Sequence, residues 1–216
     1  MRYIYMLPAA ILVPAIHEFM KALISTLQGD QTPREQGFLT ANPFKYFEPI
    51  GFVFILMFGG LGWGQPTPTA ALHYRDRKLG TLLTYMLPVL ITLLLGVGAI
   101  ITVALLFGAP MGVREFSLIF AFSQVEPHAQ TIALIMLLHF GVISINFALF
   151  NLIPVYPLAA HKLVIIFGSP DTIARVNHYE KHMQIALILL LALRLMGAAI
   201  GPVSSWIITM ALRFAN

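Results

Sequence analysis

The stretch Ala15-Ile16-His17-Glu18-Phe19-Met20-Lys21-Ala22 places three ionisable side chains inside an otherwise apolar segment, residues 3–27. At about 1.5 Å per residue, a helix over this segment is long enough to cross the ~30 Å hydrocarbon core of a bilayer. Ionisable groups at membrane depth face a bundle interior or a cavity rather than lipid. We therefore expect His17, Glu18 and Lys21 to face other parts of the protein.

The composition of the whole chain agrees with a membrane location. Of its 216 residues, 58% are hydrophobic and only 10% are charged, with a mean hydropathy of +0.83. Soluble domains carry about a quarter charged residues. We predict an all-α integral membrane protein, a polytopic helical bundle that forms a single domain over residues 1–216.

Composition also excludes several classes of site. The chain has no cysteine, so a disulfide framework, a thiolate nucleophile and a cysteine metal site are excluded. Its formal net charge of +4 comes from scattered basic residues rather than a basic stripe with interleaved aromatics, so no nucleic-acid partner is expected. The sequence shows no inverted repeat or paired broken helices, so transport has little support.

Three further apolar segments, residues 81–107, 129–152 and 184–213, predict spanning helices. The apolar run from Pro49 to Gly62 is only about 14 residues long, which is too short to cross the hydrocarbon core. We predict a re-entrant or interfacial segment there.

Smaller features are predicted between and within these segments. Phe38-Leu39-Thr40 could form a short strand after the first helix. Residues 108–128 are expected to be a loop with an amphipathic stretch at Arg114–Phe122. In the last apolar segment, the helix is expected to break at Gly197, Gly201 and Pro202.

Charge placement favours one topology. If residues 49–62 are re-entrant, residues 28–80 and 153–183 lie on the same side of the membrane, together with most of the basic loop residues. The positive-inside rule makes that side cytoplasmic. The first segment lacks the features of a cleaved signal peptide, and we expect an integral protein of a prokaryotic plasma membrane.

The quoted stretch matches the helix motif His-Glu-x-x-His except at its last position. In that motif the two histidines bind zinc from one helix face, and the glutamate activates the zinc-bound water. Here the second histidine is replaced by Lys21. An ammonium group has no lone pair for a metal, and its charge repels one.

Several blocks of sequence carry a resemblance to a known family. They are Gly29-Asp30-x-Thr32, Gly37-x-Leu39-Thr40-x-Asn42-Pro43, Pro49-x-Gly51, Gly62-Trp63-Gly64-Gln65-Pro66-Thr67-Pro68 and Asn151-Leu152-Ile153-Pro154-Val155-Tyr156-Pro157-Leu158. In this order they resemble motifs of the site-2 protease family of intramembrane zinc metalloproteases, in the small form without a PDZ domain. The resemblance implies a zinc site built from both helix histidines and an aspartate that follows the last block.

The chain departs from the family at the positions that the resemblance assigns to zinc. The second histidine is Lys21, and the aspartate is Ala159, so His17 is the single family ligand that remains. A catalytic zinc needs three protein ligands and an open position for water. The family's Ala-Gly-Pro-x-x-Asn pattern reads Met86-Leu87-Pro88-Val89-Leu90-Ile91 here, without its asparagine.

These departures are physically consistent with one another. Without a metal, a buried Glu18 needs a cation, and Lys21 lies three residues further on the same helix face. We hypothesise that Lys21 takes the electrostatic place of the metal, and that Ala159 removes a carboxylate that would lack a partner. No metal or other cofactor is then expected.

The resemblance implies that the Asn151–Leu158 block helps to hold an extended substrate, so Asn151, Pro154 and Pro157 are candidates for a substrate or partner groove. We predict a catalytically inactive protein similar to this family, a pseudoprotease. It would lie in the lipid bilayer and bind another membrane protein or transmembrane segment as an accessory subunit, chaperone or regulator. The alternative is a divergent, active zinc metalloprotease that uses His17, Glu18 and a substitute ligand such as His161.

Other polar residues have simpler interpretations. His178 and His182 are four apart and could hold a metal, but no third ligand is near them in sequence, which favours a solvated helix start. His139 is interpreted as an interhelical hydrogen-bonding residue and Ser144 as a helix-packing residue. Arg194 is expected to pair with a partner or to extend toward the interface.

Overall fold

The computed structural model describes residues 2–107 and 129–214. The predicted loop at residues 108–128, with its amphipathic stretch at Arg114–Phe122, lies outside the described residues.

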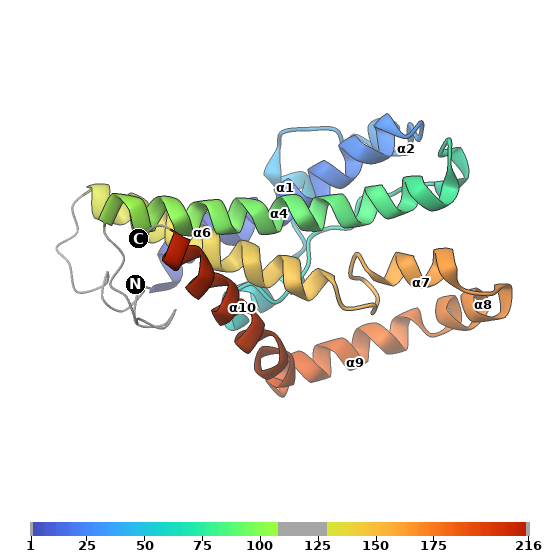
Figure 1. Cartoon of the computed structure of the whole chain (residues 1–216). Helices are drawn as coiled ribbons and strands as arrows, with labels where there is room; N and C mark the ends of the chain where they lie inside the picture. Colours follow the sequence, from blue (N-terminus) through green and yellow to red (C-terminus); the bar gives the residue numbers. More distant parts are fainter. Residues whose placement is uncertain (1, 108–128, 215–216) are drawn as a thin grey trace.

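Long apolar helices form the body of the protein (Figure 1). Among the described residues, four are long and apolar enough to cross a membrane: α1 (Arg2–Leu27), α4 (Arg77–Phe107), α6 (Ala129–Asn151) and α10 (Leu195–Phe214). The prediction of a polytopic helical membrane bundle is therefore confirmed, and α1 and α6 begin and end close to the predicted bounds.

Short elements connect and flank these helices. They are α2 (Thr32–Glu35), η1 (Pro43–Tyr46), α3 (Pro49–Phe58), η2 (Ala71–His73), α7 (His161–Phe167), α8 (Pro170–His178) and α9 (Glu180–Ala192). Helix α3 has 10 residues, so it rises about 15 Å and is too short to cross the hydrocarbon core. Its predicted re-entrant or interfacial position remains a prediction.

Figure 1 shows both chain termini at one end of the long helices, with α2, the start of α4, and α7 and α8 at the other end. Parts of the segments 28–80 and 153–183, namely α2, the start of α4, α7 and α8, therefore lie at the same end of the bundle. The placement of both whole segments on one side of a membrane remains a prediction. The assignment of that end to the cytoplasm remains a prediction.

The expected strand at Phe38–Thr40 is not formed, and the described residues contain no strand. The carbonyl oxygens of Phe38 and Thr40 both accept from the Tyr46 hydroxyl rather than from a neighbouring strand. The Phe38 ring packs edge-on against the Tyr46 ring, with centroids 5.9 Å apart. The apolar residue that favoured a strand in the sequence is thus a buried contact of an irregular segment.

The break in the last apolar segment lies earlier than predicted. Helix α9 ends at Ala192, and α10 begins at Leu195 and continues through Pro202. Arg194 makes the turn with a φ of 60°, in the left-handed region. Gly197 and Gly201 lie in open surroundings, where a Cβ would meet nothing within 4 Å, and a transmembrane helix can accommodate a proline.

Close packing between α4 and α6 depends on a pair of glycines. A Cβ on Gly96 would lie 2.9 Å from the Ser144 Cβ and 3.0 Å from the Gly141 carbonyl oxygen. A Cβ on Gly141 would lie 3.1 Å from the Gly96 carbonyl oxygen. Small residues at such crossings let helix backbones approach, which is how membrane helices gain van der Waals contact. Ser144 is buried in this contact, as the packing interpretation requires.

Gly96→Ala is therefore expected to destabilise the bundle by about 1–3 kcal/mol, because the added methyl group has no space between the two backbones. The matched control is Gly98→Ala, two residues along the same helix, where a Cβ would meet nothing within 4 Å. Alanine favours helix more than glycine does, so the control should be neutral or stabilising. Thermal unfolding in detergent, followed by circular dichroism, measures both; equal melting temperatures would contradict the packing role.

Asp30 attaches the segment after α3 to the end of α1. Its side chain is fully buried, and it accepts from the Ser25 hydroxyl at 2.9 Å and from the backbone N–H groups of Thr32 and Ala70 at 3.0 and 2.8 Å. Burial alone would raise the pKa of Asp30, but these hydrogen bonds outweigh it and lower the pKa to about 2. The Asp30 carboxylate thus fixes where residues 65–70 pass the first helix.

The pKa of Asp30 gives a pH prediction. Because its folded-state pKa is below the ordinary value of 3.8, its contribution is present above about pH 4 and is lost as the pH falls toward 2. Asp30→Asn should therefore cost about 2 kcal/mol at pH 6 and much less near pH 2.5. Denaturant unfolding in detergent at both pH values measures the loss in the free energy of unfolding. Asp76→Asn is the control. Asp76 caps α4, and asparagine caps a helix about equally well, so this variant should keep its stability at both pH values. A pH-independent effect of Asp30→Asn would contradict this.

Candidate functional site

His17 lies in the middle of α1 and is fully buried. Its Nδ1 is 3.3 Å from the Thr92 Oγ1 of α4, and that hydroxyl donates its own proton to the Pro88 carbonyl at 2.8 Å. Thr92 must then accept from His17, which assigns the proton to Nδ1 and leaves a lone pair on Nε2. The Nε2 atom has no hydrogen-bond partner among the described residues, and the His17 and Phe147 rings form a T-shaped pair with centroids 5.3 Å apart.

Glu18 and Lys21 form a buried ion pair. The Lys21 Nζ is 2.6 Å from the Glu18 Oε1, and both residues are 4% exposed. The second oxygen, Oε2, accepts from the backbone N–H of Thr67 at 2.8 Å, and the Thr67 hydroxyl donates to the Glu18 backbone carbonyl at 3.0 Å. Both carboxylate oxygens are therefore occupied by protein donors.

Glycines allow the chain segment that contains Thr67 to reach α1. A Cβ on Gly64 would lie 3.0 Å from the Pro14 Cβ and 3.4 Å from the Glu18 Cγ. A Cβ on Gly62 would lie 2.4 Å from the Gly51 carbonyl oxygen. Gly60, Gly62 and Gly64 thus permit close backbone packing, whereas Gly59 ends α3 with a φ of 65°, in the left-handed region that favours glycine.

Ala159 lies against α4 and α6, where it is 2% exposed and packs in a small apolar cluster with Tyr85, Val89 and Ala148. Its methyl group brings no metal donor to this position. Asn151 orders the turn before it: the Asn151 side-chain carbonyl accepts from the Ala159 N–H at 3.3 Å, and its backbone carbonyl accepts from the Ala160 N–H at 3.0 Å.

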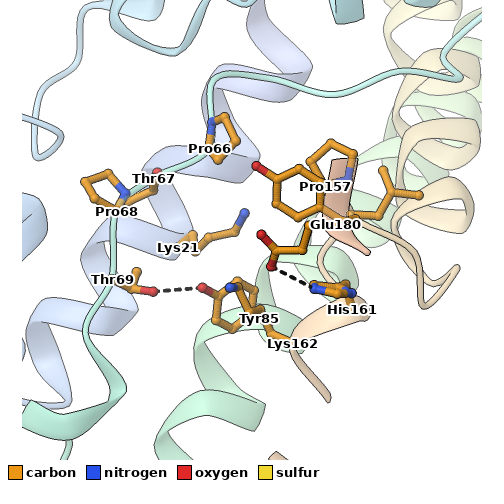
Figure 2. A pocket seen from close by; sticks show the side chains of 12 residues that line it. Lys21, Pro66, Thr67, Pro68, Thr69, Tyr85, Pro157, His161, Lys162 and Glu180 are labelled. Carbon is orange, nitrogen blue, oxygen red and sulfur yellow. Dashed lines mark hydrogen bonds and ion pairs between the residues drawn. The ribbon is translucent and has the colours of Figure 1, made fainter. Parts of the chain in front are cut away.

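A pocket of about 310 Å³ opens beside Lys21 (Figure 2). Its walls come from α1, the 66–69 segment, α4, the turn before α7, α7 itself and the start of α9. The lining residues are Lys21, Pro66, Thr67, Pro68, Thr69, Tyr85, Tyr156, Pro157, Leu158, His161, Lys162 and Glu180.

The predicted groove residues are distributed unevenly around this pocket. Pro157 lines it, whereas Asn151 is buried in the turn and Pro154 is exposed outside it. Sequence reasoning missed Tyr85, Lys162 and Glu180. Tyr85 could have been suspected as a site residue, because it is a polar aromatic residue within an apolar spanning helix. Nothing in the sequence places Lys162 and Glu180 beside α1.

His161 is 1% exposed and faces Glu180, with its Nε2 at 3.3 Å from the Glu180 Oε1 (Figure 2). Burial lowers the pKa of His161, and the hydrogen bond and the charge of Glu180 only partly oppose that effect. His161 is therefore neutral at pH 7, and its Nδ1 has no partner among the described residues.

Three further histidines, His139, His178 and His182, do not line this pocket. His178 ends α8 and His182 belongs to α9, so the four-residue spacing does not lie on one continuous helix, and both residues contact the Tyr179 ring. His139 lies 2.7 Å from the Ile135 carbonyl oxygen of its own helix.

Comparison with known proteins identifies a bacterial relative. No protein-family model matches the chain, and no solved structure gives a significant match. The chain is 26% identical over 199 residues to a protein of Bacillus subtilis (strain 168) named "Putative zinc metalloprotease YwhC". The match covers 92% of this chain and 84% of the relative. The similarity thus spans most of both chains, and the relative's name agrees with the metalloprotease resemblance of the motifs.

The residues present do not fit a catalytic zinc ion. Zinc in such sites takes three protein ligands, but His17 offers one lone pair, Glu18 is engaged, and Lys21 and Ala159 offer none. Elsewhere in residues 2–107 and 129–214, no three histidine, aspartate or glutamate side chains lie together as a metal site. In the geometry around α1, His17 is thus a single zinc donor where three are needed.

If Glu18 and Lys21 form a buried ion pair, removing one partner should destabilise the protein more than removing both. Lys21→Met should cost about 3–5 kcal/mol, because it leaves the buried Glu18 carboxylate without its cation. Adding Glu18→Gln to that variant should recover most of the loss, since the pair is then replaced by neutral groups of similar size. Lys78→Met, at an exposed position on α4, is the control and should change stability by less than about 0.5 kcal/mol.

Denaturant unfolding of the four proteins in detergent, together with the Glu18→Gln single variant, gives the coupling free energy of the pair. A Lys21→Met protein as stable as the wild type would contradict the buried pair.

Proposed function

We propose that this chain is a site-2-protease-like membrane protein without peptidase activity, which acts by binding another membrane protein as an accessory subunit, chaperone or regulator. The observation that carries the proposal is the Lys21–Glu18 ion pair at 2.6 Å, at the position where the helix motif would have its second histidine. The similarity to a protein named as a zinc metalloprotease, over 92% of the chain, supports the family part of the proposal.

The environment of Glu18 argues against a role in hydrolysis. A general base must take a proton from water, so one carboxylate oxygen must be accessible to that water. Glu18 is 4% exposed, and its two oxygens accept from Lys21 and from the Thr67 N–H. A zinc ion would need the space and the charge position that the Lys21 ammonium fills.

A binding role agrees with what remains of the site. The pocket keeps walls from widely separated parts of the chain, and the Pro66–Thr69 segment and Pro157 still line it. Irregular backbone within a membrane protein is tolerated where protein or a cavity covers it. A partner that inserts an extended piece of chain would meet this surface.

The second candidate is a divergent, active zinc metalloprotease with His17, Glu18 and His161 as its metal and base residues. In its favour, His17 Nε2 and His161 Nδ1 are both buried and have no hydrogen-bond partner among the described residues. Against it, Lys21 lines the pocket with His161, and His161 Nε2 is turned to Glu180.

Zinc stoichiometry of the detergent-purified protein separates the two candidates. We expect near-zero zinc per chain, measured by inductively coupled plasma mass spectrometry, with no change in His17→Ala. About one zinc per chain that disappears in His17→Ala would overturn the pseudoprotease proposal.

A positive control can be built from the chain itself. The double variant Lys21→His with Ala159→Asp supplies the two ligands that the family motif has at these positions, and we expect it to retain zinc through the same purification. Affinity purification of the wild type from native membranes, followed by mass spectrometry, then tests the binding role: a stoichiometric membrane-protein partner is the expected result.

A further inference from the structure

The pocket beside Lys21 has a volume of about 310 Å³. This size is at the lower end of the range for small-molecule sites in proteins. A side chain, a chain end or a small molecule is an occupant of matching size.

Lys21 presents a buried cation to this space. Figure 2 shows its side chain directed into the pocket from α1. A lysine ammonium has three donors, and one of them is used by Glu18. The ring of Tyr85 lies 5.3 Å from the Lys21 Nζ and covers one side of it. Donors remain for an acceptor that enters the pocket.

Other lining groups are also donors. The Thr69 and Tyr85 hydroxyls are 2.7 Å apart, so one donates to the other and one proton is left over. The Lys162 ammonium forms no ion pair with any residue in the described part of the chain. The lining is therefore richer in donors than in acceptors.

The acceptors are few. Glu180 is the single carboxylate in the pocket lining, and one of its oxygens faces His161. Glu18 lies behind Lys21 with both oxygens engaged. Glu18, which pairs with Lys21, and Glu180 balance the charges of Lys21 and Lys162, so an anion would be held by the unused ammonium protons of the two lysines rather than by a net charge.

We propose that this pocket is a carboxylate-binding site, in which the ammonium groups of Lys21 and Lys162 bind one carboxylate of a partner, either a chain-terminal carboxylate or an aspartate or glutamate side chain. Both ammonium groups keep donors that no described residue uses, and charge-assisted hydrogen bonds are the strong ones. The proposal rests on the proposed function, because it requires Lys21 rather than a metal at the end of the pocket.

Three capped dipeptides serve as probes. They are N-acetyl-Leu-Phe with a free C-terminal carboxylate, the same peptide as its C-terminal amide, and N-acetyl-Asp-Phe amide, which carries its carboxylate on a side chain. Binding to the detergent-purified full chain is measured by titration with ligand-observed NMR at pH 7. At least one of the two acids should bind about tenfold more tightly than the neutral amide, the difference of ~1.4 kcal/mol expected between charge-assisted and neutral hydrogen bonds.

Variants around the pocket should shift the affinity of the acid in opposite directions. Lys162→Met should weaken binding several-fold, whereas Glu180→Gln should strengthen it, because Glu180 repels the ligand. A purely structural role of these residues would not produce this change of sign. Lys181→Met, on an exposed lysine next to Glu180 that does not line the pocket, should leave binding unchanged.

The two acids identify the source of the carboxylate. Preference for the free C-terminus indicates a chain end, and preference for the aspartate peptide indicates an acidic side chain. Equal binding of acids and amide, or no binding to a protein with a normal unfolding transition, overturns the carboxylate site. Zinc content measured on the same samples keeps the two proposals apart: a zinc-free protein that does not prefer the acids disproves only the carboxylate site, whereas a zinc-loaded protein disproves the proposed function.

Discussion

The structure around α1 depends on the need of one buried carboxylate for partners. Glu18 lies deep in an apolar bundle, where an uncompensated charge would be strongly unfavourable. Lys21 and the Thr67 N–H satisfy its two oxygens. The first partner comes from the same helix, and the second comes from a segment 49 residues further along the chain. The same carboxylate therefore organises the charge of the site and the path of the backbone beside it.

A second buried carboxylate fixes the other end of that segment. Asp30 binds the Ala70 N–H, as Glu18 binds the Thr67 N–H. Between these two attachments the chain forms one wall of the pocket. The Thr69 hydroxyl of this wall is hydrogen-bonded to the Tyr85 hydroxyl of α4. The position of this wall is therefore set by two acidic side chains, Glu18 within α1 and Asp30 just after it, which each accept a hydrogen bond from a backbone N–H of the segment.

Much of the fold could be predicted from the sequence, because the length of an apolar run is set by the bilayer. The predicted spans 3–27 and 129–152 agree with α1 and α6 almost to the residue. The turn at Arg194 could not be predicted, since Gly197, Gly201 and Pro202 are stronger local signals, and a helix in open surroundings simply continues through them. The closeness of Glu18 and Lys21 follows from helical spacing. The contributions of Lys162 and Glu180 to the pocket depend on how α7 and α9 pack, which local sequence does not specify.

The pattern of donors along the wall of the pocket has a consequence for the backbone itself. From Gln65 to Pro68 every amide position is either engaged or has no hydrogen: Gln65 donates to the Tyr46 carbonyl, Thr67 donates to Glu18, and the two prolines have no N–H. A β-ladder requires each strand both to give and to receive hydrogen bonds. This stretch can only receive them, so it is protected from the edge-to-edge association to which exposed extended chains are prone.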